Sequence, residues 1–216
     1  EEPIALDVQL NKSEAFIEKN WKKIAIIIGA VIVIVTGFYI YKNQMADKEL
    51  DAQKAIAIAQ VAFAQEQYEQ ALNGDGNSKG FVKIINEYSG TKTANLAKLY
   101  AGLSYAKTDK VDEAIKYLED FSTQDDDIVS PSAIAALGNL YIQKGDNEKG
   151  IKTLIEAADK ANNDAVSPVF LLQAGQVYES MNQSDKAVEL YNTIKTKYFR
   201  SPVAQEIDKY IERATK

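Results

Sequence analysis

The side chains that most often perform acid–base, nucleophilic or metal chemistry are scarce in this chain. Its 216 residues include no histidine and no cysteine, which removes the commonest general base, the commonest metal ligand and all thiolate and disulfide chemistry. A serine nucleophile would need a lysine base, and each serine that we can place is predicted to cap a helix or lie in solvent. No glycine-rich phosphate-binding motif occurs. We therefore expect a protein that is not an enzyme and uses no cofactor, no metal and no small-molecule substrate.

Two short acidic segments are the remaining candidates for cation binding. The segment Gly74–Asn77 (GDGN) looks like part of a calcium loop but lacks the alternating carboxylates and the closing glutamate. Asp125–Asp127 falls between two predicted helical pairs. We interpret the first as a turn and the second as a solvated connection. The net charge of −6 and the lack of basic clusters also argue against nucleic acid as a partner.

The longest charge-free run of the chain lies between Lys23 and Lys42. Residues 24–41 read IAIIIGAVIVIVTGFYIY, and a helix of this length reaches about 27 Å, close to the ~30 Å hydrocarbon thickness of a bilayer. We predict a transmembrane helix over residues 24–41, preceded by a short tail over residues 1–23. Aromatic rings suit the membrane interfaces and lysines reach the head groups, so the predicted anchoring side chains are Trp21, Lys22, Lys23, Tyr39 and Tyr41.

Three other interpretations of this run fit its length and flanks less well. A buried core helix keeps a polar face and seldom contains more than ~14 consecutive apolar residues. A secretory signal peptide has a shorter apolar region followed by a small-residue cleavage site, which residues 39–44 do not provide. A buried strand would end within about eight residues. The run is therefore predicted to be a permanent single-span anchor.

A segment of high helix propensity follows the anchor. Residues 46–73 contain neither glycine nor proline, and Ile56, Ala59 and Phe63 mark one apolar side. We predict a long helix over 46–73 that can run on from the anchor. It would be the first helix of a degenerate repeat whose second helix covers residues 80–88.

From residue 78 to about residue 200 the sequence repeats a two-helix pattern. Hydroxyl residues stand where helices are predicted to begin, and proline follows the last three of them, as expected for an N-cap before the first helical position; they are Thr91, Ser130, Ser167 and Ser201. Each unit then has Gly-x-x-Tyr on its first helix and, nine residues after the tyrosine, a small residue on its second. These residues are Gly102, Tyr105 and Ala114; Gly138, Tyr141 and Gly150; and Gly175, Tyr178 and Ala187.

The pattern resembles the tetratricopeptide repeat (TPR) over residues 92–197. Small residues let the two helices of a pair approach closely, and the tyrosine fills the gap to the neighbouring unit. The intervals of 36 and 37 residues exceed the family's 34 residues, and Lys98, Ile134 and Leu171 replace its first aromatic residue. The resemblance implies an all-α fold, with a TPR-like solenoid over residues 42–216 that ends in a capping helix at 201–216.

The resemblance also maps a concave groove onto the first helix of each pair. This face is largely apolar with two amides, and it lacks the basic residues that would hold a C-terminal carboxylate. It suits a helix or a hydrophobic segment of a protein partner. The alternative is that the helix over 46–73 packs into the groove and makes it part of the core. The positions are Leu96, Leu99, Leu103 and Ala106; Ser132, Ala135, Asn139 and Ile142; and Val169, Leu172, Gln176 and Glu179.

Lysines are denser before the anchor than after it. Lys19, Lys22 and Lys23 lie within five residues of its start, and on the other side only Lys42 is that close. The positive-inside rule favours a cytoplasmic N-terminus and a solenoid outside the membrane, which is the periplasm in a Gram-negative bacterium. The chain begins at Glu1 instead of Met, so we expect an initial piece to precede it.

The sequence of short tail, single anchor, long Ala-rich helix and TPR units is similar to that of the YfgM family. This resemblance implies an ancillary subunit of the Sec translocon in the bacterial inner membrane. Such a subunit associates with SecYEG and with the membrane-anchored periplasmic chaperone PpiD, and assists proteins that emerge on the periplasmic side. The alternative, from another functional class, is a structural scaffold subunit of a different envelope or secretion assembly.

Overall fold

The computed structural model describes residues 5–216, with side chains from residue 14 onward. Over this range the chain forms ten helices, and the one β-type pairing is an isolated bridge between Gly74 and Lys79. The all-α prediction is confirmed. The chain divides into two compact units, of which the first ends at Leu50 and the second runs from Asp51 to Lys216.

The first unit consists of the N-terminal part of α1, a helix that runs without interruption from Ala5 to Ala64. From Glu14 onward this helix is long and apolar enough to cross a membrane, since its most apolar window has a mean hydropathy of 2.6. The residues of that window are not buried inside the structure. The five predicted anchoring side chains are all exposed, and the Lys22 amino group lies 5.9 Å from the centroid of the Trp21 ring. Of the predicted tail over residues 1–23, the part from Ala5 onward is helical, and its first four residues lie outside the described range.

The predicted helix over 46–73 is wrong in its second half. Helix α1 ends at Ala64, the chain turns at Glu66 with a left-handed φ of 61°, and α2 (Tyr68–Asn73) follows. The turn allows Ala71 and Leu72 to be buried in the same cluster as residues 56–62 of α1. The apolar area thus removed from water outweighs the high helix propensity of residues 65–70.

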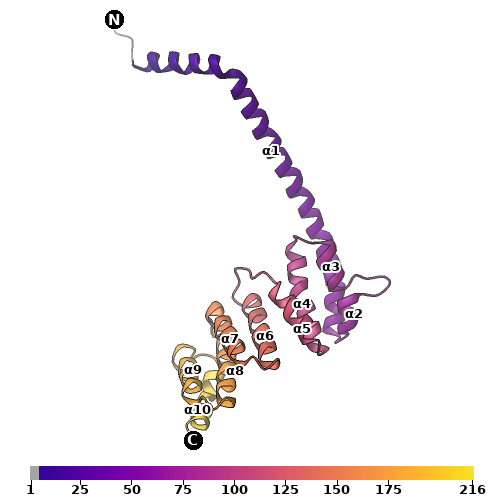
Figure 1. The fold of residues 1–216 in the computed structure, drawn as a ribbon, viewed down its shortest axis with the longest axis vertical. Coiled ribbons are helices and arrows are strands. Elements are labelled where there is room, and N and C mark those ends of the chain that lie inside the picture. The colour runs from indigo at the N-terminus through magenta and orange to yellow at the C-terminus, as the bar shows by residue number, and fades with distance from the viewer. Residues whose placement is uncertain (1–4) are drawn as a thin grey trace. The chain divides into compact units, whose positions relative to one another are not determined.

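Helical pairs make up the rest of the second unit, and each helix packs against the next along the chain (Figure 1). Three pairs, α4–α5, α6–α7 and α8–α9, are the three predicted repeats, and α10 is the predicted capping helix. Helix α3 precedes them in the position predicted for the second helix of a degenerate unit. The bounds are α3 (Phe81–Glu87), α4 (Lys92–Lys107), α5 (Val111–Glu119), α6 (Val129–Gln143), α7 (Asn147–Ala161), α8 (Ser167–Ser180), α9 (Ser184–Lys197) and α10 (Pro202–Ala214).

The small residues of the repeat stand where two helices touch. A Cβ atom added at Gly138 would lie 3.0 Å from the carbonyl oxygen of Gly150, and one added at Gly150 would meet the Ile142 side chain and lie 2.7 Å from the carbonyl oxygen of Gly138. A Cβ atom at Gly175 would meet the ring of Tyr191. Because helical backbone can yield little, a larger side chain at these positions would force the pair apart. The predicted reason for small residues is confirmed.

The turn inside each pair is the same in all three repeats. One residue adopts a left-handed conformation, and the next N–H donates at 2.9 Å to the carbonyl oxygen of the repeat tyrosine. This is the bond that closes a Schellman-type helix end. The left-handed residues are Asp109, Gly145 and Asn182, and the donor–acceptor pairs are Lys110 with Tyr105, Asp146 with Tyr141, and Gln183 with Tyr178.

Two of the four predicted N-caps are correct. The hydroxyl oxygens of Thr91 and Ser201 accept hydrogen bonds from backbone N–H groups in the first turns of α4 and α10. The prediction is wrong for Ser130 and Ser167, because α6 begins at Val129 and α8 at Ser167 itself, and neither helix receives a side-chain cap from its serine.

Polar side chains four positions earlier bind backbone N–H groups at or just before these helix starts. Asp126 Oδ1 accepts from the N–H groups of Ile128 and Val129, and Asn163 Oδ1 accepts from those of Ala165 and Val166. The buried serine hydroxyls instead hold the incoming loops, with Ser130 accepting from the N–H of Gln124 and Ser167 from that of Asn163.

The acidic segment Asp125–Asp127 is therefore more than a solvated connection. Burial alone would raise the pKa of Asp126, but hydrogen bonds from the Ser130 hydroxyl and from backbone N–H groups outweigh it and lower that pKa. Asp125 and Asp127 remain exposed. Only the central carboxylate has a structural role in starting α6.

Candidate partner-binding surface

The part of the predicted groove that lies on α4 is mostly core. Leu99 is buried in a cluster that includes Ala133 and Leu140 of α6, and Leu96 and Leu103 are half-buried against the same cluster. These leucines are long enough to reach the next repeat, so they fill the interface between repeats. Ala135 on α6 is likewise buried, in the adjoining cluster.

Five further predicted positions lie on the surface of α6 and α8. Three of them are exposed and two are half-buried, and the amide nitrogen of Asn139 lies 3.3 Å from Oε1 of Gln173, which links α6 to α8. We call these five residues the α6–α8 surface: Asn139, Ile142, Val169, Leu172 and Gln176. They offer amide hydrogen bonding beside aliphatic area, which is what a binding site for an amphipathic segment needs.

The part of α1 that belongs to the second unit does not cover the α6–α8 surface. Its residues Ile56, Ala59 and Ala62 are buried in one cluster that also contains residues of α3 and α4; these are Phe81, Ile84, Ala97 and Ala101. The described members of that cluster include no residue of the α6–α8 surface. The alternative was that the predicted helix over 46–73 packs into the groove. It therefore applies only to the end of the groove that lies on α4.

Glu179 stands at the last predicted groove position but is occupied by partners within the fold. Its carboxylate accepts two hydrogen bonds from Arg213 of α10 and one from the hydroxyl of Tyr191 of α9. Arg213 chiefly, and Tyr191 in addition, hold the pKa of Glu179 below its usual range. Sequence analysis missed this contact because nothing in the spacing of residues 179 and 213 signals a pair.

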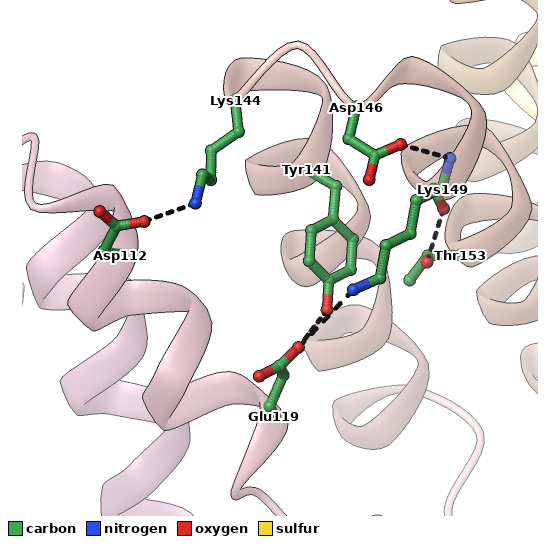
Figure 2. A network of polar contacts seen from close by, with 7 residues as sticks. All are labelled: Asp112, Glu119, Tyr141, Lys144, Asp146, Lys149 and Thr153. Atoms are coloured by element: carbon green, nitrogen blue, oxygen red, sulfur yellow. Dashed lines mark hydrogen bonds and ion pairs between the residues drawn. The ribbon is translucent and has the colours of Figure 1, made fainter.

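A second polar cluster joins the first two repeats, and Figure 2 shows it from close by. The Tyr141 hydroxyl donates to Glu119 at 2.6 Å, and the Lys149 amino group lies 3.7 Å from the centroid of the Tyr141 ring. Lys144 reaches back to Asp112 at 2.7 Å. Burial and the bond to Glu119 raise the pKa of Tyr141, so the phenol stays protonated and remains a donor. Tyr141 thus joins its repeat to the preceding one through the Glu119 carboxylate.

A cleft lies away from the predicted groove, beside the loops that precede α4 and α6. Its volume is about 490 Å³, and several of its polar lining residues are paired within the fold. Asn95 exchanges two hydrogen bonds with the backbone of Ser122, at 2.7 and 2.8 Å, and Lys98 binds Asp120 at 2.8 Å. Few polar groups are left to hold a ligand. Within the described range, acidic side chains do not gather into a group that could hold a metal ion.

Comparison with known proteins agrees with the fold. The model of the tetratricopeptide repeat-like domain family matches residues 14–198. Nearly identical TPR-like repeats of a putative kinesin light chain from Podosopora anserina superpose with a TM-score of 0.57 at 14% identity, over 75% of this chain and 84% of that chain. MamA gives a TM-score of 0.46 at 20% identity, over 75% and 91% of the two chains. No curated protein matches.

Proposed function

The chain belongs to the tetratricopeptide repeat-like domain family, and from this membership we propose that it is a membrane-anchored protein-interaction module. A TPR solenoid is typically a scaffold that binds other proteins and performs no catalysis. The observation that carries the proposal is the combination of an exposed apolar helix with a solenoid whose α6–α8 surface is not covered by the residues of α1 from Asp51 onward.

The proposed mechanism is positioning. The anchor would confine the solenoid to the membrane surface and so raise its effective concentration near membrane-bound partners. The α6–α8 surface would take an amphipathic helix or a hydrophobic segment, with Leu172 and Val169 against its apolar side. The Asn139 and Gln176 amides would bond to its polar groups. The surface carries no lysine or arginine, so a free carboxylate is not the expected determinant.

We further propose that this module is an ancillary subunit of the Sec translocon in the bacterial inner membrane. Its N-terminus would be cytoplasmic and its solenoid periplasmic, where SecYEG and a PpiD-like membrane chaperone would be its partners and emerging proteins its clients. The support is the resemblance of the whole layout to the YfgM family, together with the excess of lysines before the anchor.

A scaffold subunit of another envelope assembly is the second candidate. The observation in its favour is the series of polar contacts between neighbouring helices, such as Tyr141 of α6 with Glu119 of α5 and Arg213 of α10 with Glu179 of α8. These contacts stiffen the solenoid, and stiffness suits a part that holds large subunits in place.

Purification of the full chain through a C-terminal tag in mild detergent distinguishes the two candidates. Mass spectrometry of the bound proteins should find Sec channel subunits and a periplasmic chaperone of the PpiD type as main components. Recovery of outer-membrane or secretion-apparatus proteins without Sec subunits would reject the translocon function and leave the anchored scaffold.

A further inference from the structure

The segment of α1 that follows Lys54 has an exposed face without charge. Residues 55–65 contain no charged side chain, and Ile58 and Val61 are 53% and 56% exposed. One turn before Lys54, Leu50 is 53% exposed. A helix in contact with water normally carries charged residues on its outer face. An apolar outer face is therefore a sign that another molecule covers it.

This outer face has the seven-residue period of a coiled-coil seam. Leu50, Ala57 and Ala64 are spaced by seven, and Lys54 and Val61 by seven, so that the five alternate as d and a positions of a heptad. We call them the α1 seam. The buried residues of the same helix fall on the opposite side and pack into the solenoid; they are Ala52, Ile56, Ala59 and Ala62. One face of α1 thus packs into the core of its own chain, and the α1 seam on the opposite face remains exposed.

We propose that the α1 seam pairs with the α1 seam of a second copy of this chain, in a parallel two-helix coiled coil beside the membrane. In a parallel pair every residue faces its own counterpart. In both copies the same number of residues separates the apolar run from the seam, which favours a pairing in register. A single lysine at one a position, here Lys54, is a feature that fixes register and strand number in such pairs.

The residues beside the seam permit pairing of identical chains. Positions that flank a coiled-coil seam choose the partner through their charges, and like charges there repel a second copy. Beyond Lys54 the flanking residues are Ile58, Gln60 and Gln65, which carry no charge. Asp51, the charged flanking residue nearest the membrane, pairs with Lys54 of its own helix at 3.0 Å. No flanking charge beyond Lys54 opposes self-association or favours a different partner.

The seam is too short to hold two copies together without help. Five positions bury well under the ~1,200 Å² of a stable interface, so pairing should depend on confinement in the membrane, which raises the effective concentration of the second copy. The pair is therefore expected in membranes and should dissociate on dilution in detergent.

Disulfide cross-linking in the membrane tests the pairing directly, because the chain has no cysteine of its own. Full-length Ala57→Cys and Val61→Cys chains, each coexpressed with two different tags, are oxidised in isolated membranes. Matched controls are Gln53→Cys, an exposed residue that flanks the seam on the same helix, and Asn192→Cys, exposed on α9. We expect a product of twice the chain mass that carries both tags at positions 57 and 61, several-fold more abundant than at 53 or 192.

Each other outcome overturns the pairing. A product with one tag and a different mass would show that another protein covers the seam. Equal cross-linking at positions 53, 57 and 192 would indicate random collision. No product at 57 or 61, in chains that remain in the membrane and keep their helical circular dichroism, would show that the seam has no protein partner.

Discussion

Arg213 of α10 reaches Glu179 of α8 with two hydrogen bonds, from Nε to Oε2 at 2.9 Å and from Nη2 to Oε1 at 2.8 Å. The two residues belong to helices that are not successive in the chain, and Tyr191 of α9, between them, donates to the same carboxylate. The Glu179 side chain is 16% exposed and that of Arg213 is 56% exposed. One carboxylate thus joins the last repeat to the capping helix.

Arg213→Ala should destabilise the solenoid by about 1–2 kcal/mol, because the largely buried carboxylate of Glu179 loses a hydrogen-bonding partner. The loss is not larger, because the Arg213 side chain is about half exposed to water. Arg213→Lys should recover only part of the loss, since an ammonium group cannot make two parallel bonds. Urea unfolding of the full chain in detergent, followed by the near-ultraviolet dichroism of the tyrosines, measures both. Equal stability of wild type and Arg213→Ala would show that the contact contributes nothing.

The contribution of Glu179 should depend on pH. Its folded-state pKa is lowered, mainly by Arg213, so its stabilising effect is complete above the unfolded-state pKa of about 4.3 and is lost as the pH falls through the folded-state value. The difference in unfolding free energy between wild type and Glu179→Gln should therefore shrink on acidification below about pH 4.3. A difference that stays constant from pH 7 to pH 3 would contradict the assigned pairing. The comparison with Glu179→Gln removes the effects of Asp126 and Glu87, whose pKa values are also lowered.

Gly150→Ala should destabilise the second repeat by about 1–3 kcal/mol, the usual cost of overpacking, because its methyl group would meet Ile142 and the backbone of Gly138. The sign of this change in stability is informative, because helix propensity alone predicts the opposite. At an open helix position, replacing glycine by alanine stabilises the helix by about 1 kcal/mol. Gly76→Ala is the control, as no atom lies within 4 Å of its added methyl group. If Gly150→Ala proved as stable as the control, the close approach of α6 and α7 would not explain the small residue.

Asn139→Arg combined with Gln176→Arg should abolish recovery of the protein partner and leave the solenoid folded. Both side chains are exposed, so the change affects the α6–α8 surface without opening the core, and two added charges oppose an apolar ligand. Asn192→Arg, exposed on α9, is the control. Quantitative mass spectrometry of the tagged full chain measures the result, and unchanged recovery by the double variant would place the binding surface elsewhere.

Most of the fold could be predicted from the residues that recur in each repeat and from those that begin or end helices. The Gly-x-x-Tyr pattern predicted three pairs because glycine permits close helix contact. In the structure the turns within the pairs use Asp109, Gly145 and Asn182, which are residue types that tolerate a left-handed conformation. The break at Glu66 was missed because the local propensity of residues 65–70 favours helix. Only the burial of Leu72 against distant residues decides it.

The candidate site was harder to predict. The position of a residue in the repeat indicates the helix face on which it lies, but not whether a neighbouring repeat buries it. Leu99 and Asn139 share the face assigned to the groove, yet one is core and the other exposed. The difference arises from the larger leucine reaching into the next repeat. Glu179 was assigned to the same face, but its engagement with Arg213 depends on how α10 returns to α8, which is a long-range packing outcome.

Labelling of single cysteines with a membrane-impermeant maleimide tests the central claim, that one anchor holds the solenoid outside the inner membrane, most directly. Lys19→Cys reports the predicted tail and Asn192→Cys reports the solenoid, and both side chains are exposed. In intact bacteria Cys introduced at 192 should react and Cys introduced at 19 should react only after lysis. Reaction at 19 alone, or equal reaction at both positions before lysis, would contradict the membrane-anchored arrangement proposed for this chain.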